Sequence, residues 1–293
     1  RKLGKVLINE KISNYTTYKV GGKVRAIVYP KNKEELCELI KFLKEKNVKY
    51  FTLGNGSNVL FSDNLYDGII IKLDYFNSVE YLDDLTIRVG AGVSLMKLSR
   101  ETVKKGLTGL EFADGIPATI GGAIFMNAGA YGSEMAKIVK EVYIVDGTGE
   151  IRTLSNKDMS FSYRTTWLQK NLDCVCIGAT IKLKEGNQEE ISSLVLERRN
   201  KRKESQPLAF PSAGSVFRNP KDMYAGELIE KMGLKGFSIG KAEISEKHAN
   251  FIINKGNAKA SDIKKIIDYV KEKAKSKYNV RLRVEQRLIN WEE

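Results

Sequence analysis

Hydrophobic and polar positions follow two different periods along the chain. Apolar residues recur every three or four positions in three segments, which predicts amphipathic helices at 33–47, 94–105 and 261–276. Runs rich in Val and Ile predict strands at 24–30, 68–73, 85–92, 142–146, 175–183 and 280–290. Because these elements show no regular strand–helix–strand repeat over residues 1–185, the pattern favours an α+β fold over a doubly wound sheet.

Two glycine-rich segments interrupt these elements. The first is GNGSN at 54–58, which follows a predicted short strand, and the second is GIPATIGGAIFMNAGAYG at 115–132. Glycine concentrates where the backbone takes positive φ or passes close to another group. Such a segment can form a tight turn, or it can present backbone N–H groups to phosphate oxygens. The first segment lacks the spacing of a Rossmann or P-loop fingerprint, and the second is too short and glycine-rich for a membrane helix.

The composition is that of a globular protein of 293 residues, with 42% hydrophobic and 29% charged residues. No apolar run reaches the length of a membrane span, and the basic N-terminus lacks the apolar core of a signal peptide. A cytoplasmic protein with no membrane partner is therefore expected. The three cysteines, Cys37, Cys174 and Cys176, form no metal pattern and are expected to be small buried or half-buried thiols.

The formal net charge of +13 has several possible meanings. It can reflect nucleic-acid binding, anionic small substrates, or a lysine-rich surface without local function. The dense basic run is ERRNKRK at 197–203, and neither a nucleic-acid motif nor an aromatic platform accompanies it. The sequence therefore favours anionic small ligands such as phosphates and carboxylates, with no nucleic-acid partner.

Three polar residues lie in segments that restrict the backbone or break its pattern. Arg164 follows two aromatic residues in FSYRTTW, Ser215 follows a glycine in the proline-flanked PSAGSVFRNP, and Glu285 interrupts the predicted C-terminal strand. Plain structural interpretations also stand: Ser215 can bond its own backbone in a turn, and Glu285 can lie on a solvated strand edge beside arginines. A Ser–His hydrolase is weakly supported, because His248 is the lone candidate base and no GxSxG motif is present.

A set of motifs occurs in order along nearly the whole chain: NYTTYKVGG, LGNGSNVL, GIPATIGGAIFMNAGAYG, SYRTTW, PSAGSVFRNP, HANFI and VEQRLI. In combination they closely resemble the UDP-N-acetylenolpyruvoylglucosamine reductase family, in its shorter form without an extra substrate-covering insertion. Two positions depart from the family pattern. They are Ala118-Thr119, where relatives often carry Gly-Ser or Gly-Thr, and Gln286, which follows the terminal glutamate.

The resemblance implies an α+β fold of the vanillyl-alcohol-oxidase type, with FAD between two subdomains. The implied domains are FAD-binding subdomain 1 at 1–74, FAD-binding subdomain 2 at 75–185 and a smaller α+β substrate-binding domain at 186–293, whose terminal strand returns toward the flavin. Backbone N–H groups of 54–58 and 115–122 would hold the FAD pyrophosphate, and 127–132 would lie along the flavin. The implied cofactor-binding residues are Gly54, Asn55, Gly56, Ser57, Asn58, Gly115, Ile116, Pro117, Gly121, Gly122, Asn127, Gly129 and Ala130.

The implied activity is that of UDP-N-acetylmuramate dehydrogenase, a flavoprotein oxidoreductase of peptidoglycan synthesis and cell wall biogenesis, and thus of cell shape, cell cycle and cell division. NADPH would reduce FAD and then leave, and UDP-N-acetylglucosamine enolpyruvate would take its place and be reduced. Arg164 and Glu285 match the pair that orients and polarises the substrate carboxylate, with Glu285 either bonding through a proton or lying against Arg164. Ser215 matches the proton donor. The implied substrate-binding residues are Tyr163, Arg199 and Asn219, and no metal is implied.

Two other functions stay open on sequence alone. An FAD-binding subunit of a larger oxidoreductase would share the cofactor fold, but it would not need Arg164, Ser215 and Glu285 together. A basic scaffold or nucleic-acid-binding protein would use the run at 197–203, and it would be colourless rather than yellow when purified.

Overall fold

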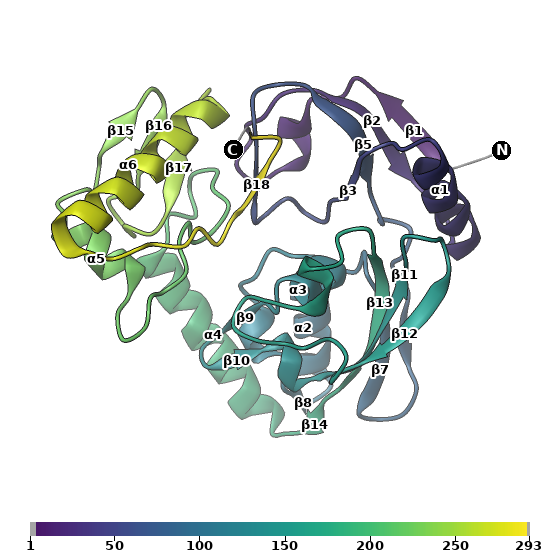
Figure 1. Ribbon diagram of the computed structural model, residues 1–293. Helices are drawn as coiled ribbons and strands as arrows, with labels where there is room; N and C mark the ends of the chain where they lie inside the picture. The colour runs from purple at the N-terminus through teal and green to yellow at the C-terminus, as the bar shows by residue number, and fades with distance from the viewer. Residues whose placement is uncertain (1–3, 292–293) are drawn as a thin grey trace. The chain divides into compact units, whose positions relative to one another are not determined.

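The computed structural model describes residues 4–291, which divide into two compact units (Figure 1). Unit 1 contains residues 4–8, 26–55 and 68–200, and unit 2 contains residues 9–25, 56–67 and 201–291. Each unit buries its own hydrophobic core. The division therefore follows packing rather than chain order.

The main sheet of unit 1 is antiparallel, with its strands in the order β12-β11-β13-β7-β6 (Figure 1). The strand bounds are Val79–Tyr81 (β6), Thr86–Gly90 (β7), Val139–Val145 (β11), Ile151–Ser155 (β12) and Val175–Lys182 (β13). The central strand β13 is buried along nearly its whole length, with only Lys182 exposed. Helix α3 (Ile120–Phe125) packs against β13 and β7.

A second sheet has its strands in the order β1-β2-β5-β3. The bounds are Lys5–Ile8 (β1), Val24–Tyr29 (β2), Tyr50–Thr52 (β3) and Tyr66–Ile71 (β5). Helix α1 (Lys33–Glu45) begins where the side chain of Asn32 accepts a hydrogen bond from the N–H of Glu35. Its buried residues recur at the predicted helical spacing: Leu36, Leu39, Ile40 and Leu43.

Shorter elements complete unit 1. Helix α2 is Leu95–Lys104, and α4 (Gln188–Ser205) contributes residues 188–200 to this unit. Two ladders pair β8 (Leu107–Thr108) with β14 (Lys184–Glu185), and β9 (Gly129–Ala130) with β10 (Ser133–Glu134). The 3-10 helices are η2 (Glu111–Ala113), η3 (Met135–Lys137) and η4 (Trp167–Gln169).

Unit 2 combines helices α5 and α6 with a small antiparallel sheet, β15-β16-β17 (Figure 1). The carboxylate of Asp63 accepts hydrogen bonds from the N–H groups of Ala260 and Ser261, each at 2.9 Å, so it caps the start of α6. The bounds are Ile12–Tyr15 (η1), Ala225–Lys231 (α5), Ser238–Ile239 (β15), Ala242–Ile244 (β16), Ile252–Asn254 (β17) and Ala260–Tyr278 (α6).

The C-terminal strand is shorter than the sequence predicts. Only β18 (Arg287–Ile289) forms a ladder, which is parallel to β4 (Val59–Phe61), whereas Val284 forms an isolated bridge with Phe217. Because this segment pairs with two partners in succession, the alternating pattern of 280–290 does not become one continuous strand.

The predicted helices at 33–47, 94–105 and 261–276 correspond to α1, α2 and α6. Cys37 and Cys174 are half-buried and Cys176 is buried, as predicted. The domain boundaries at 74/75 and 185/186 stay a prediction. Between residues 4 and 291, no helix is long and apolar enough to cross a membrane.

Candidate functional site

The first two residues of the loop at 54–58, Gly54 and Asn55, contact the second glycine-rich segment within unit 1. The side-chain amide of Asn55 donates a hydrogen bond to the carbonyl of Pro117 at 3.2 Å. A Cβ placed on Gly54 would lie 2.6 Å from Oγ1 of Thr119, which is closer than real Cβ atoms approach. Gly54 is therefore glycine because the second segment lies directly against it.

The loop at 54–58 offers an unusual row of hydrogen-bond donors. Within residues 4–291, none of its backbone N–H groups donates to a protein acceptor. Some of its carbonyls, in contrast, are in use: Gly54 accepts from Nζ of Lys72 at 2.8 Å, and Gly56, at φ +64°, accepts from the N–H of Thr17. Consecutive free N–H groups form a cradle that suits phosphate oxygens.

The second segment uses most of its N–H groups internally. Between residues 115 and 122, five of them donate to protein acceptors, and those of Gly115 and Thr119 do not, within the part of the chain that the structure describes. Gly121 instead permits close packing, because a Cβ there would lie 3.0 Å from Cβ of Ala91. This segment therefore presents fewer N–H groups than the loop at 54–58. The five bonded N–H groups belong to Ile116, Ala118, Ile120, Gly121 and Gly122.

The structure brings Arg164 together with the end of the second segment. Nη2 of Arg164 donates to the carbonyl of Gly129 at 2.7 Å, and Nη1 donates to that of Asn127 at 3.4 Å. The Asn127 side chain is fully buried and bonds the carbonyl of Ser162 at 2.9 Å and the N–H of Ala136 at 3.0 Å. The guanidinium is thus fixed beside the segment 127–130, which includes the predicted residues Gly129 and Ala130.

Arg164 itself has a left-handed backbone, with φ +53°. A non-glycine residue in this region costs roughly 1–2 kcal/mol, so the surroundings must hold it there. The side chain of Gln169 does so by donating to the carbonyls of Arg164, at 3.0 Å, and Phe125, at 2.8 Å. Tyr163 is half exposed, and its ring centroid lies 5.2 Å from Cζ of Arg164. Sequence reasoning missed Gln169, because a lone glutamine in a turn gives no signal.

Ser215 and Glu285 lie on adjacent segments of unit 2. The N–H of Glu285 donates to the carbonyl of Val216 at 2.8 Å, directly after Ser215. The side chain of Asn250 clamps the next residue, accepting from the N–H of Phe217 at 2.9 Å and donating to its carbonyl at 2.8 Å. The backbone on both sides of the pair is therefore well fixed. Arg164, the third residue of the predicted set, belongs to unit 1.

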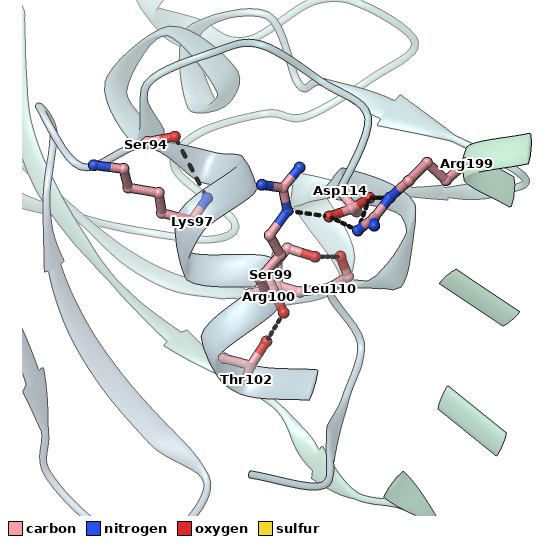
Figure 2. A network of polar contacts seen from close by, with 8 residues as sticks. All are labelled: Ser94, Lys97, Ser99, Arg100, Thr102, Leu110, Asp114 and Arg199. Carbon is pink, nitrogen blue, oxygen red and sulfur yellow. Dashed lines mark hydrogen bonds and ion pairs between the residues drawn. The ribbon is translucent and has the colours of Figure 1, made fainter. Parts of the chain in front are cut away.

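An ion-pair cluster forms around Asp114, the residue directly before Gly115 (Figure 2). Asp114 is buried, and its carboxylate accepts from Nε of Arg100 at 2.7 Å and from Nε of Arg199 at 3.0 Å. Nη2 of Arg199 donates to Oδ1, the oxygen that also accepts from Arg100, at 3.1 Å. Arg199 thus contacts both carboxylate oxygens of Asp114, and this contact is bidentate. Figure 2 shows both guanidinium groups converging on the one carboxylate. Arg199 is therefore anchored through Nε and Nη2, and its Nη1 forms no hydrogen bond within the described chain.

The remaining candidates have mainly structural contacts. Oδ1 of Asn219 accepts from the N–H of Ala225 at 3.1 Å, at the start of α5. Nδ1 of His248 accepts from the N–H of Asn250, and burial lowers the pKa of the His248 side chain. A neutral His248 ring that accepts from the N–H of Asn250 has a structural role, so no catalytic role is needed to account for it.

Comparison with known proteins points to one family. The family model "FAD binding domain" matches residues 24–155, and "UDP-N-acetylenolpyruvoylglucosamine reductase, C-terminal domain" matches residues 206–289. Proteins named UDP-N-acetylenolpyruvoylglucosamine reductase from Anoxybacillus flavithermus and Bacillus subtilis are 45% and 42% identical, over 98% and 99% of this chain and 95% of each relative. The crystal structure of the Thermus caldophilus reductase matches with a TM-score of 0.83 and 33% identity, over 97% of this chain and 98% of that one.

These matches confirm the family and the α+β, FAD-binding fold that the sequence motifs predict. The two family models fall on the two regions in which the glycine-rich segments and the Ser215 loop lie. The chain carries an FAD-binding domain and belongs to the UDP-N-acetylenolpyruvoylglucosamine reductase family.

Proposed function

We propose that this chain is an FAD-dependent enzyme that uses NADPH to reduce UDP-N-acetylglucosamine enolpyruvate to UDP-N-acetylmuramate, in peptidoglycan precursor synthesis. Family membership supports the proposal, and the observation that carries it is the row of unpaired N–H groups at 54–58, whose first two residues contact the second glycine-rich segment. When bound, FAD supplies the carrier that takes a hydride from NADPH and gives it to the terminal vinyl carbon of the substrate. The proposal places the enzyme in the cytoplasm, because charged nucleotides do not cross a bilayer unaided.

The residues present fit a bound dinucleotide. The N–H groups of 54–58, Gly115 and Thr119 would face the diphosphate, and Pro117 with the Gly121–Gly122 pair would let the backbone lie close to it. The segment 127–130 would contact the flavin ring. The proposed cofactor-binding residues remain Gly54, Asn55, Gly56, Ser57, Asn58, Gly115, Ile116, Pro117, Gly121, Gly122, Asn127, Gly129 and Ala130.

Three side chains would act on the substrate. Hydride addition at the vinyl carbon leaves negative charge on the neighbouring carbon and on the carboxylate, and Arg164 and Glu285 would orient and polarise that carboxylate. Ser215 would donate its hydroxyl proton to the neighbouring carbon, and solvent would then return a proton to the serine. Within the described chain the Ser215 hydroxyl has no protein hydrogen-bond partner, which leaves it available to the substrate.

The proposed substrate contacts are Tyr163, Arg199 and Asn219. The ion pair with Asp114 holds Arg199 while Nη1 stays available for a diphosphate oxygen. Asn219 commits Oδ1 to Ala225 and leaves its amide N–H groups for a uridine or phosphate acceptor.

Rapid-mixing absorbance of the purified yellow protein, under anaerobic conditions, tests this function. NADPH is expected to bleach the visible flavin band, and UDP-N-acetylglucosamine enolpyruvate is expected to restore it. A colourless protein would favour the scaffold function. A reduced flavin that the enolpyruvyl sugar fails to reoxidise would contradict the proposed reaction.

Gly54→Ala is expected to weaken FAD binding by about 10- to 100-fold, measured by flavin fluorescence titration of the apoprotein. The new methyl group would meet Oγ1 of Thr119, and relief of such overpacking costs about 1–3 kcal/mol. The two segments would separate, and the N–H cradle would move away from the diphosphate.

Gly233→Ala serves as the matched control for this experiment. Gly233 has φ +71°, and an alanine methyl group at this position would have no atom within 4 Å, so the substitution strains the backbone without a clash. It is expected to lower stability slightly and to keep FAD. Equal flavin loss in both variants would show that the contact between Gly54 and Thr119 has no special role.

A further inference from the structure

Gln286 is a buried residue that the proposed reaction does not use. It follows Glu285 directly in the sequence. Its side chain is only 3% exposed. A buried amide costs stability unless its donors and acceptor are satisfied, so its partners indicate why it is retained.

The hydrogen-bond partners of the Gln286 side chain lie in unit 2. Nε2 donates to the carbonyls of Ala213, at 3.1 Å, and Gly214, at 3.3 Å, the two residues before Ser215. Oε1 accepts from the hydroxyl of the fully buried Tyr18 at 3.2 Å. Burial raises the pKa of Tyr18, so its hydroxyl stays protonated and donates. The amide therefore has a fixed orientation, with its NH₂ group toward the Ser215 loop.

The backbone of Glu285 is held at the same place. Its N–H donates to the carbonyl of Val216 at 2.8 Å, and its carbonyl accepts from Nδ2 of Asn58 at 3.3 Å. The Gln286 side chain bonds the chain before Ser215, and the Glu285 N–H bonds the chain after it. Ser215 thus lies between two links to a single dipeptide, Glu285-Gln286.

The hydrogen bond from Gln286 to Gly214 fixes a residue whose backbone is flexible. It has φ +71°, and it precedes Ser215 directly, so its backbone can take several conformations that differ in where the serine points. The bond from Nε2 of Gln286 to its carbonyl selects one of them. Loss of that bond would free the hydroxyl from its donor position while leaving the surrounding core filled.

We propose that Gln286 is a positioning residue that locks the Ser215 loop to the Glu285 segment, and so sets the proton donor and the carboxylate-polarising acid in fixed relation. The inference rests on the proposed function, because it takes Ser215 as the proton donor. It assigns Gln286 an effect on substrate reduction and none on the reaction of NADPH with the enzyme.

The first test is Gln286→Met, which keeps the length of the side chain and removes its donors. Reduction of the flavin by NADPH should stay within twofold of the native rate, while reoxidation by the enolpyruvyl sugar should slow about 10- to 100-fold, the effect of a misplacement near 1 Å. Gln188→Met is the matched control, because Gln188 donates to the carbonyl of Lys104 in unit 1 at an exposed position. It should change neither half-reaction.

The second test is Gln286→Glu, which converts the link into a pH-dependent one. A protonated carboxyl can donate to one of the two carbonyls while its other oxygen accepts from Tyr18. An ionised carboxylate would face both carbonyl oxygens and repel them. Reoxidation in this variant should therefore fall as pH rises, along a limb that the native enzyme and Gln286→Met both lack.

Hydrogen–deuterium exchange of the holoenzyme gives a readout that does not depend on turnover. In Gln286→Met, the peptides that contain Val216 and Glu285 should exchange faster than in the native protein, and peptides of unit 1 should not change. Unchanged exchange, or equal slowing of both half-reactions, would overturn the proposal. If the sugar failed to reoxidise the native protein, the proposed function would be contradicted instead. The exchange measurement would still test whether Gln286 holds the Ser215 loop to the Glu285 segment.

Discussion

Replacing Ser215 with alanine is expected to leave flavin reduction by NADPH intact and to slow reoxidation by the enolpyruvyl sugar by about 10²–10⁴-fold, the usual contribution of a general acid. A serine hydroxyl is a weak acid near neutral pH. It can nevertheless protonate a strongly basic carbon centre when it lies within hydrogen-bond reach. The loop that carries Ser215 is fixed by Asn250 and Gln286, so a water molecule that takes the place of the hydroxyl would be a poorer, less oriented donor.

The measurement is single-turnover reoxidation of prereduced enzyme, followed at the flavin band. Ser205→Ala is the matched control, because the Ser205 hydroxyl bonds the carbonyl of Lys201 on exposed helix α4. The control should react at the native rate. If Ser215→Ala slowed both half-reactions equally, Ser215 would be acting on cofactor binding or folding, and its role as proton donor would be wrong.

Arg164→Met should slow reoxidation by about 10²–10³-fold, a loss typical for one charge-stabilising donor. Methionine fills similar space but offers no positive charge to the carboxylate of the substrate. The reoxidation rate of Arg164→Lys should lie between those of the native enzyme and Arg164→Met. Lysine restores the charge, but it lacks the planar guanidinium that bonds the carbonyls of Gly129 and Asn127.

Arg152→Met controls for the loss of an arginine from unit 1, since Arg152 is exposed and pairs with Asp146 at 2.7 Å. Titration of the reduced enzymes with the sugar separates binding from reaction. A rise in the substrate concentration needed for half-maximal rate, with no fall in the maximal rate, would mean that Arg164 serves binding alone.

Sequence periodicity predicted the helices well because their apolar faces recur locally. The buried residues of α1 and α6 lie where the spacing of Leu and Ile places them. Sheet order was not predictable in the same way, since β13 pairs with β7 and β11, and such long-range pairing leaves no local mark. The predicted C-terminal strand was too long for the same reason. Alternation of apolar and polar residues indicates an extended segment, but it does not show how many partner strands that segment pairs with.

For the site, glycine density alone indicated the two segments that meet at Gly54 and Thr119, and the roles of Arg164, Ser215 and Glu285 came from the resemblance. Both stay proposals until the variants are measured. The side chains that hold these residues in place could not be predicted from the sequence. Gln286 and Gln169 act through amide–carbonyl bonds to distant backbone, and neither their residue type nor their spacing signals such a bond.

The pairing of β18 with β4 also constrains when the protein can fold. Asn58 bonds Glu285 across 227 residues, and Tyr18 bonds Gln286 across 268. On the ribosome, the early segments 9–25 and 56–67 must wait, without their partners, until residues 201–291 have been synthesised. A nascent chain would therefore expose the side chains of Tyr18 and Leu60 until that later segment emerges, which is the interval in which a chaperone would protect them.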